Sequence, residues 1–257
     1  MRFIILIFLL FFSCSSYADV ITGEVTKENQ RNENIIYDNA TNLPIEGVVI
    51  KVPAKKIITK TDKNGAFQLK TQIDFPTIML LEKNGYKPYS MTLAENFKNP
   101  IQIGIEKITP NEIVVDTNMI HLGDDSYSER SANASEFSLL SMGSFYSNDF
   151  NVHTYKPDED LYLVIGSIIG IDTLHSQRLG QSRVISSYAS PPEVFINGNK
   201  IADIKINGDN QKIKIPKGLV RFNQFNNLTI KAGRNLQKIT SIDFDDIEFT
   251  NILFEIK

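Results

Sequence analysis

The 257-residue sequence lacks tryptophan and contains one cysteine, Cys14. Its three histidines, His121, His153 and His175, show neither His-x-His nor His-Glu-x-x-His spacing. Zinc needs three or four nitrogen or sulfur ligands, so three separated histidines and one cysteine argue against a zinc centre. The sequence also has no Gly-x-Ser-x-Gly elbow, P-loop or Gly-x-Gly-x-x-Gly motif. Serine-hydrolase and nucleotide chemistry therefore lack their usual sequence signals.

A basic excess and a long apolar run are missing as well. The chain carries 27 Lys and Arg residues against 30 Asp and Glu residues, a formal net charge of −3. Proteins that bind nucleic acid or an anionic membrane surface usually carry the opposite imbalance, so neither partner is expected. The apolar run Phe3–Phe12 is shorter than the roughly 20 residues of a membrane span, and no transmembrane segment is expected.

The N-terminus has the pattern of a secretory signal peptide. A short positive end, Met1-Arg2, precedes the apolar run, and Ser16-Tyr17-Ala18 supplies small residues at a cleavage site. Cleavage after Ala18 predicts an exported protein, either periplasmic, at the cell surface or secreted. The alternative is a lipid anchor at Cys14, although Phe11-Phe12-Ser13 is a poor match to the Leu-small-small triplet of bacterial lipoproteins.

Isoleucine is the abundant residue, with 35 copies. β-Branched side chains pack well on a pleated surface, so this composition predicts an all-β fold. We expect two β-sandwich domains: a small seven-stranded one over 19–108 and a jelly-roll-like one over 151–257. Residues 109–150 are rich in Ser, Asn, Asp and Glu and predict a polar linker or the entry to the second domain.

Residues 19–108 alternate between short apolar segments and turn signals. The segments Val48–Val52 and Ile57–Thr61 predict strands, and Asp62-Lys63-Asn64-Gly65 predicts a hairpin turn after them. Asn84-Gly85 predicts another turn after Thr77–Leu81. Asp62 and Asn64 are interpreted as turn formers rather than as metal ligands.

This region resembles the carboxypeptidase regulatory-like family, which consists of small prealbumin-like sandwiches. The matching positions are Gly23-Glu-Val25, Tyr37-Asp38, Asn42-Leu-Pro44-Ile45-Glu-Gly47-Val48, Thr61-Asp62-Lys-Asn64-Gly65-Ala-Phe67-Gln-Leu69 and Asn84-Gly85-Tyr86. The polar insertion Lys27–Asn34 departs from the family pattern. The resemblance implies a non-catalytic appendage of an exported or surface protein.

The C-terminal half predicts further strands. Leu161–Ile171 reads as one or two buried strands, and Ile247–Ile256 as a closing strand. Asn197-Gly198 and Asn207-Gly208 predict hairpins, which favours an antiparallel arrangement. This half resembles galactose-binding-like jelly rolls, the architecture of many carbohydrate-binding modules. The matching positions are Val194–Gly198, Asn226–Ile230 and Asp243–Phe249.

An acidic cluster precedes and enters the last strand: Asp243, Asp245, Asp246 and Glu248. Strand alternation would place Asp243 and Asp245 on one face and Asp246 and Glu248 on the other. Carboxylates with loop carbonyls suit Ca²⁺, which takes six to eight oxygen ligands, and the resemblance to jelly-roll modules implies a structural calcium. The alternative is a solvated acidic turn.

Two other polar groups deserve comparison with catalytic patterns. Asp158-Glu159-Asp160 forms a second acidic group, and Asp172, His175 and Ser176 supply the residue types of a triad. Polar residues after a buried strand usually form a loop, which is the interpretation of Asp172, His175 and Ser176. Glycosidase chemistry needs two carboxylates about 5–10 Å apart across a cleft, and nothing in the sequence shows a cleft. A carboxylate-based hydrolase remains the third hypothesis.

Sugar-binding sites combine exposed aromatic rings with amides and charged groups. Tyr188, in a polar Ser-Ser-Tyr-Ala-Ser-Pro-Pro stretch, is the best candidate ring, ahead of Tyr146, Tyr155 and Tyr162. Its expected polar partners are Arg178, Arg183 and Asn226. The sequence thus predicts a non-catalytic binding protein with a glycan ligand. The alternative is a structural or adhesive protein with a surface-protein partner.

Overall fold

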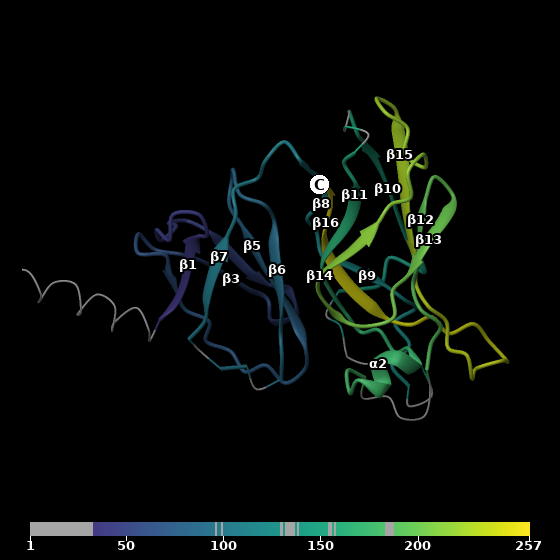
Figure 1. The fold of residues 1–257 in the computed structure, drawn as a ribbon. Helices are drawn as coiled ribbons and strands as arrows, with labels where there is room; N and C mark the ends of the chain where they lie inside the picture. The colour runs from purple at the N-terminus through teal and green to yellow at the C-terminus, as the bar shows by residue number, and fades with distance from the viewer. Residues whose placement is uncertain are drawn as a thin grey trace, which may run out of the picture.

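The computed structural model describes residues 33–95, 97–98, 100–128, 131, 137, 139–153, 156, 158–182 and 188–257. The predicted signal peptide, Cys14 and the Gly23–Val25 match lie outside these residues. The described residues form an almost purely β structure, and the predicted all-β fold of two sandwiches is confirmed (Figure 1).

The N-terminal sandwich packs a three-stranded sheet, in the order β4-β1-β7, against a four-stranded sheet, in the order β3-β2-β5-β6. Its strands are β1 (Asn34–Asp38), β2 (Val49–Val52), β3 (Ile57–Lys60), β4 (Ala66–Phe67), β5 (Thr77–Glu82), β6 (Tyr89–Leu93) and β7 (Gln102–Ile105). A 3₁₀ turn, η1 (Pro53–Lys55), lies between β2 and β3. The sheets enclose an apolar core that includes Ile36, Ile50 and Met79.

The two predicted turns of this sandwich form, but only one closes a hairpin. Asn84-Gly85 joins β5 to its antiparallel neighbour β6, and Gly85 has a φ of 80°. Asp62 Oδ1 accepts hydrogen bonds from the Asn64 and Ala66 amides at 2.8 and 3.0 Å. However, β3 pairs with β2 whereas β4 pairs with β1. The Asp62–Gly65 turn therefore carries the chain from one sheet to the other, and the predicted hairpin is wrong.

The C-terminal sandwich also has two sheets. One has the order β14-β11-β16-β8, with β9 also on β16, and the other has the order β10-β15-β12-β13. The strands are β8 (Glu112–Asp116), β9 (Ile120–Leu122), β10 (Phe145–Asn151), β11 (Leu161–Ile169), β12 (Glu193–Ile196), β13 (Asn199–Asp203), β14 (Gly208–Lys214), β15 (Phe225–Lys231) and β16 (Ile247–Ile256). One short helix, α2 (Leu174–Arg178), follows β11.

Residues 109–150 contribute three of these strands, β8, β9 and β10. Both β8 and β9 pair with the closing strand β16, which pairs with β11 on its other side. The C-terminal sandwich therefore begins at Glu112, well before residue 151, within the segment expected to be a linker or a domain entry. Its polar composition did not prevent strand formation because the strands are short and border polar loops.

The hairpin predictions of this half have mixed outcomes. Asn197-Gly198 joins β12 to β13 as predicted, with positive φ at both residues. Asn207-Gly208 does not close a hairpin, because β14 pairs with β11 in the other sheet. A turn signal fixes where the chain bends, but the sheet that the next strand joins depends on where its apolar face is buried.

The two sandwiches contact each other through β6 and the β14-β11-β16 surface. The Ser167 hydroxyl donates to the Ser90 hydroxyl at 2.9 Å, in a buried position. Asp209 accepts hydrogen bonds from the Thr92 amide and hydroxyl. A small apolar cluster of Ile78, Leu80 and Ile169 adds to the contact. These contacts hold the two sandwiches directly against each other.

Candidate functional site

Long loops gather at one end of the C-terminal sandwich, the end that carries α2 at the bottom of Figure 1. Isolated β-bridges tie the loops side by side: Thr173 pairs with Ala189, Ala189 with Asn235, and Arg234 with Phe244. We call this region the loop end. It brings together residues that are more than 60 positions apart in the sequence.

Asp172 enters the loop end directly after the buried strand β11. The neighbouring Ile171 amide donates to Asn207 Oδ1 at 2.7 Å, and the Asp172 carbonyl accepts from the Ala189 amide at 2.9 Å. Thr173 then caps α2 by accepting a hydrogen bond from the Ser176 amide at 3.1 Å. These bonds fix the backbone on both sides of Asp172, and its side chain is fully buried.

Asp245, just before β16, is the nearest acidic partner of Asp172. Its Oδ2 accepts a hydrogen bond from the Asp172 amide at 3.1 Å, and its side chain is also fully buried. Within the described part of the chain, Asp245 Oδ1 and both oxygens of Asp172 have no hydrogen-bond partner of normal geometry. An unpaired polar atom in such a place is costly, and two buried carboxylates repel each other.

Burial raises the pKa of Asp172 to about 7, and the Ser182 hydroxyl lowers it by less. Burial also raises the pKa of Asp245 well above its usual range, helped by the charge of Asp172. The physical cause is that the charged form loses more hydration than its few hydrogen-bond donors replace. The pair is therefore poised either to hold a proton or to bind a cation.

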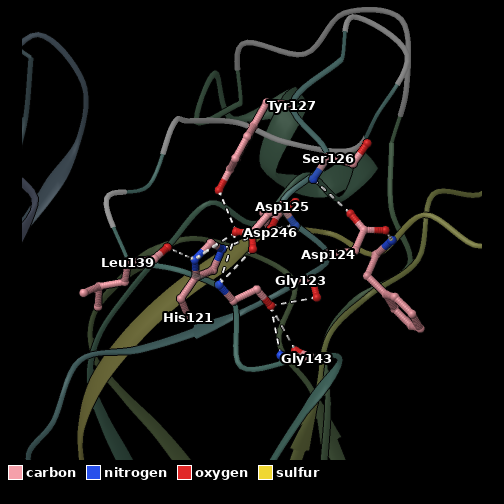
Figure 2. A network of polar contacts seen from close by, with 11 residues as sticks. His121, Gly123, Asp124, Asp125, Ser126, Tyr127, Leu139, Gly143 and Asp246 are labelled. Carbon is pink, nitrogen blue, oxygen red and sulfur yellow. Dashed lines mark hydrogen bonds and ion pairs between the residues drawn. The ribbon is translucent and has the colours of Figure 1, made fainter.

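A second buried carboxylate, Asp246, is paired with His121 (Figure 2). Its Oδ1 lies 3.0 Å from His121 Nε2 and accepts the Asp125 amide at 3.0 Å. On the other side of the ring, His121 Nδ1 lies 2.6 Å from the Leu139 carbonyl oxygen. Burial opposes protonation of His121, but the hydrogen bonds to Asp246 and Leu139 prevail and raise its pKa.

The trio His121, Asp125 and Asp246 has ligand atoms within 4.8 Å of one another, close enough to hold a metal ion. However, a carbonyl oxygen can only accept, so His121 Nδ1 must donate to Leu139. The other nitrogen faces a carboxylate and donates to it when the ring is charged. With both nitrogens engaged as donors, His121 is better explained as a buried cation than as a metal ligand.

The same network holds both ends of the connection between β9 and β10 against the acidic segment before β16. Asp124 Oδ2 accepts the Phe244 amide at 2.9 Å, and Asp125 accepts the Ser141 amide at 3.2 Å. Ser141 in turn donates to the Gly123 carbonyl at 2.8 Å (Figure 2). Gly123 has a φ of 150°, and a side chain there would collide with the Asp246 carboxylate. The loops after β9 and before β10 are thus fixed to the acidic segment.

The remaining acids of the predicted calcium cluster have other partners. Asp243 is buried and contacts Lys238 Nζ at 2.8 Å and the Asn235 amide group at 3.0 Å. Glu248 is buried on β16 beside His121, and burial raises its pKa to about 7. All four predicted acids are almost fully buried, so the alternative of a solvated acidic turn is wrong.

The Asp172–Asp245 pair offers oxygen atoms of the kind that a hard cation prefers. Three of the unpartnered buried oxygens belong to these two residues and a fourth to Asp246. Calcium binds carboxylate oxygens and completes its shell with carbonyl oxygens and water. Two aspartates with unpartnered oxygens therefore match calcium in chemistry, and the pair includes Asp172, which the sequence did not associate with the cluster.

The predicted ligand-binding residues are divided between the two ends of the sandwich. Tyr188 is half-buried at the loop end, where its carbonyl accepts the Leu236 amide at 3.0 Å. Arg178 is exposed at the last position of α2. Arg183 lies outside the described residues. Asn226 is the second residue of β15, at the opposite end, and is buried.

The Asn226 side chain is engaged in hydrogen bonds inside the protein. Its amide group donates to the Arg221 and Gln224 carbonyls at 2.8 and 3.0 Å. Its oxygen accepts from the Arg221 amide and from the Asn197 side chain, both at 2.8 Å. A side chain that uses its donors and its acceptor internally and is 1% exposed has little left for a ligand.

The other candidate rings also differ in their setting. Tyr146 is buried, packs edge-on against Phe249 and donates to Asp116 at 3.1 Å, so it cannot serve as an exposed platform. Tyr162 is half-buried on β11, and Tyr155 lies outside the described residues.

The polar groups that were compared with catalytic patterns form contacts of their own. Asp160 pairs with Lys214 at 2.6 Å, and Glu159 pairs with Lys156 at 3.5 Å. Ser176 is buried and donates to the Ile171 carbonyl at 2.7 Å, whereas His175 is exposed. The hydroxyl of Ser176 therefore serves the helix start rather than pointing to a histidine.

Comparison with protein-family models and with curated proteins finds no match to this chain. In the residues that the structure describes, no helix is long and apolar enough to cross a membrane.

Proposed function

We propose that this chain is an exported, non-catalytic binding protein, and that the loop end of its C-terminal sandwich is a carbohydrate-binding surface. Export rests on the predicted signal peptide. The observation that carries the binding function is the construction of the loop end: long loops from three parts of the chain, fixed by buried carboxylates. Binding residues concentrate on loops that a rigid scaffold positions.

Glycan is the favoured ligand class because of the side chains on this surface. The half-buried ring of Tyr188 offers an apolar face, and the exposed guanidinium of Arg178 offers donors on a neighbouring segment. Sugar rings present an apolar face to aromatic side chains and hydroxyl groups to polar ones.

Calcium is the proposed structural cofactor, held by Asp172 and Asp245. When bound, the ion supplies positive charge to carboxylates that otherwise lack donors. Because Thr173 and Ala189 are bridged next to Asp172, order at this pair extends to Tyr188. In the account proposed here, the ion stabilises the binding surface and takes no part in chemistry.

The N-terminal sandwich is proposed to be an appendage of the carboxypeptidase regulatory-like type. Its contact with the β14-β11-β16 sheet leaves the other sheet uncovered by it (Figure 1). Ala94 and Glu95 of the N-terminal sandwich also border a pocket with Gly180 and Gln181, just after α2. It would then hold the binding domain in a fixed orientation rather than bind the ligand itself.

A protein partner is the second candidate, favoured by exposed aliphatic residues at the same end. Leu236, Ile239 and Ile242 are 55%, 93% and 65% exposed on one protruding loop. Leu174 and Leu179, in and after α2, are exposed at the same end of the sandwich. Exposed apolar patches are typical of protein interaction sites.

Affinity electrophoresis of residues 19–257 through gels that contain a polysaccharide separates these candidates. We expect retardation of the wild-type chain, loss of retardation in Tyr188→Ala, and no change in Tyr162→Ala, which is half-buried at the other end of the sandwich. No retardation by any polysaccharide, with folding confirmed by circular dichroism, would contradict the carbohydrate proposal and favour a protein partner.

A further inference from the structure

The β10-β15-β12-β13 sheet has one face in the core and one face toward solvent. Exposure alternates along β10 and β15, with Tyr146, Phe150, Leu228 and Ile230 buried in the core. The N-terminal sandwich contacts the other sheet of the pair, so it leaves this face open (Figure 1).

A row of polar side chains runs across the middle of this face. Asn227 on β15 donates to the Ser147 hydroxyl at 2.9 Å and to Asp149 Oδ1 at 3.0 Å, both on β10. The Thr229 hydroxyl donates to Asn227 Oδ1 at 2.8 Å. These bonds hold two hydroxyls, an amide and a carboxylate in fixed positions at the surface, so that they need little ordering when a ligand binds.

Two exposed phenylalanines mark the ends of the row. Phe145 is 57% exposed at the start of β10, and Phe225 is 77% exposed at the start of β15. Phe145 pairs with Lys231, six residues from Phe225 along β15. At about 3.4 Å per residue, the two rings lie about 20 Å apart along the strand direction. Isolated exposed rings of this size have no packing role in the core.

The charges on the face are balanced. Lys200 bonds to Glu193 at 2.6 Å and to Asp203 at 2.7 Å, and the Lys231 ammonium lies 4.4 Å from the Phe195 ring centroid. With Asp149, the face carries both signs without an excess that would attract nucleic acid or another polyion. The buried core of a protein–protein interface is more apolar than the rest of the surface, whereas here polar groups separate the rings.

We propose that this face, which we call the sheet platform, is a second carbohydrate-binding surface that binds an internal stretch of an uncharged linear polysaccharide. This inference rests on the proposed function and adds to it a site away from the loop end. Phe145 and Phe225 stack on sugar rings at the two ends of the bound stretch. Ser147, Asp149, Asn227 and Thr229 exchange hydrogen bonds with the sugar hydroxyls between them.

The experiment is affinity electrophoresis of residues 19–257 through gels containing β-glucan, xylan or glucomannan. The variants are Phe145→Ala, Phe225→Ala, their double substitution and Tyr188→Ala. Phe75→Ala is a matched control, because Phe75 is 41% exposed on the N-terminal sandwich. Circular dichroism establishes that each variant is folded. For a gel that retards the wild type, linear oligosaccharides of increasing length are then titrated as competitors.

We expect each single phenylalanine substitution to weaken binding at least about threefold and the double substitution at least about tenfold. The Phe75→Ala control should bind like the wild type. Competitor affinity should rise with oligosaccharide length until the chain spans about 20 Å.

Two results overturn the proposal and differ from each other. If the wild type binds and the double variant binds equally well, the sheet platform is wrong while the proposed function stands. If the folded wild type binds none of the polysaccharides, the proposed function fails and the platform fails with it.

Discussion

The two ends of the C-terminal sandwich both bury polar side chains, but they satisfy them differently. At the end that contains Asn226, amide side chains bond to backbone groups and to each other, and Asn226 has four such bonds. At the loop end, Asp172 and Asp245 are buried with three oxygens that lack partners among the described residues. The arrangement around Asn226 needs only the chain itself, whereas Asn151 at the same end has a buried oxygen without a partner among the described residues. The arrangement at the loop end needs a proton or a cation, which is why we assign function to it.

Of the substitutions that test this contrast, removal of His121 should lower the free energy of unfolding the most. Its ring lies beside the buried carboxylates of Asp246 and Glu248. Burial lowers the pKa of the ring, but the hydrogen bonds to Asp246 and Leu139 raise it above the usual value. His121→Ala removes the ring that pairs with Asp246 and lies beside Glu248. Removing one partner of a buried ion pair lowers the free energy of unfolding by about 3–5 kcal/mol. Chemical denaturation followed by circular dichroism measures it.

The matched control is His153→Ala, since His153 is exposed. That substitution should change stability by less than about 0.5 kcal/mol. Equal stabilities of the two variants would show that His121 carries no buried charge pair.

A smaller loss in the free energy of unfolding is expected from a substitution at the opposite end, which contains Asn226. Asn226→Ala leaves the Arg221 and Gln224 backbone groups and Asn197 without their partner, at about 2–3 kcal/mol. Among the described residues at this end, no buried carboxylate has an unpartnered oxygen. The loss in the free energy of unfolding should therefore be the same with calcium and with chelator. A calcium-dependent loss in the same denaturation assay would break the proposed distinction between the ends.

The dependence of stability on pH sharpens the comparison further. Burial raises the pKa of Asp172 from 3.8 to about 7, so the folded chain holds a proton that the unfolded chain releases. Without calcium, the stability that this group contributes should therefore fall as the pH rises from about 4 to about 7. Burial and the nearby Asp172 charge act on Asp245 in the same direction.

Thermal unfolding at several pH values in chelator tests this slope. Asp172→Asn should flatten it, because the amide does not titrate. Glu255 supplies a contrast: burial raises its pKa, but Lys212, Lys87 and Lys257 lower it to about 2. Its contribution should be lost only as the pH falls below about 4.5, and an unchanged slope in Asp172→Asn would count against the acidic pair.

The sequence was sufficient to predict the β class and many of the strands, because alternation and Asn-Gly turns are local signals. It did not predict that the turns at Asp62–Gly65 and Asn207-Gly208 cross between sheets. Sheet membership depends on partners far along the chain, so no local residue pattern contains it.

The candidate site shows the same limit. The acids at 243–248 could be identified from the sequence, but their burial could not. Asp172 was interpreted only as a loop residue. Asp172 lies 73 positions before Asp245, and only the folded sheets bring their groups together. His121 was set aside as a lone histidine, because its acidic partner is 125 positions away.

The most direct test of a cation-completed loop end is calcium-dependent thermal unfolding of residues 19–257 at pH 7.5, followed by circular dichroism. A cation that binds the folded state raises the melting temperature as its concentration increases. We predict such a rise for the wild type and for Asp160→Asn, and none for Asp172→Asn or Asp245→Asn. A wild-type melting temperature that is the same in millimolar calcium and in chelator would contradict the account.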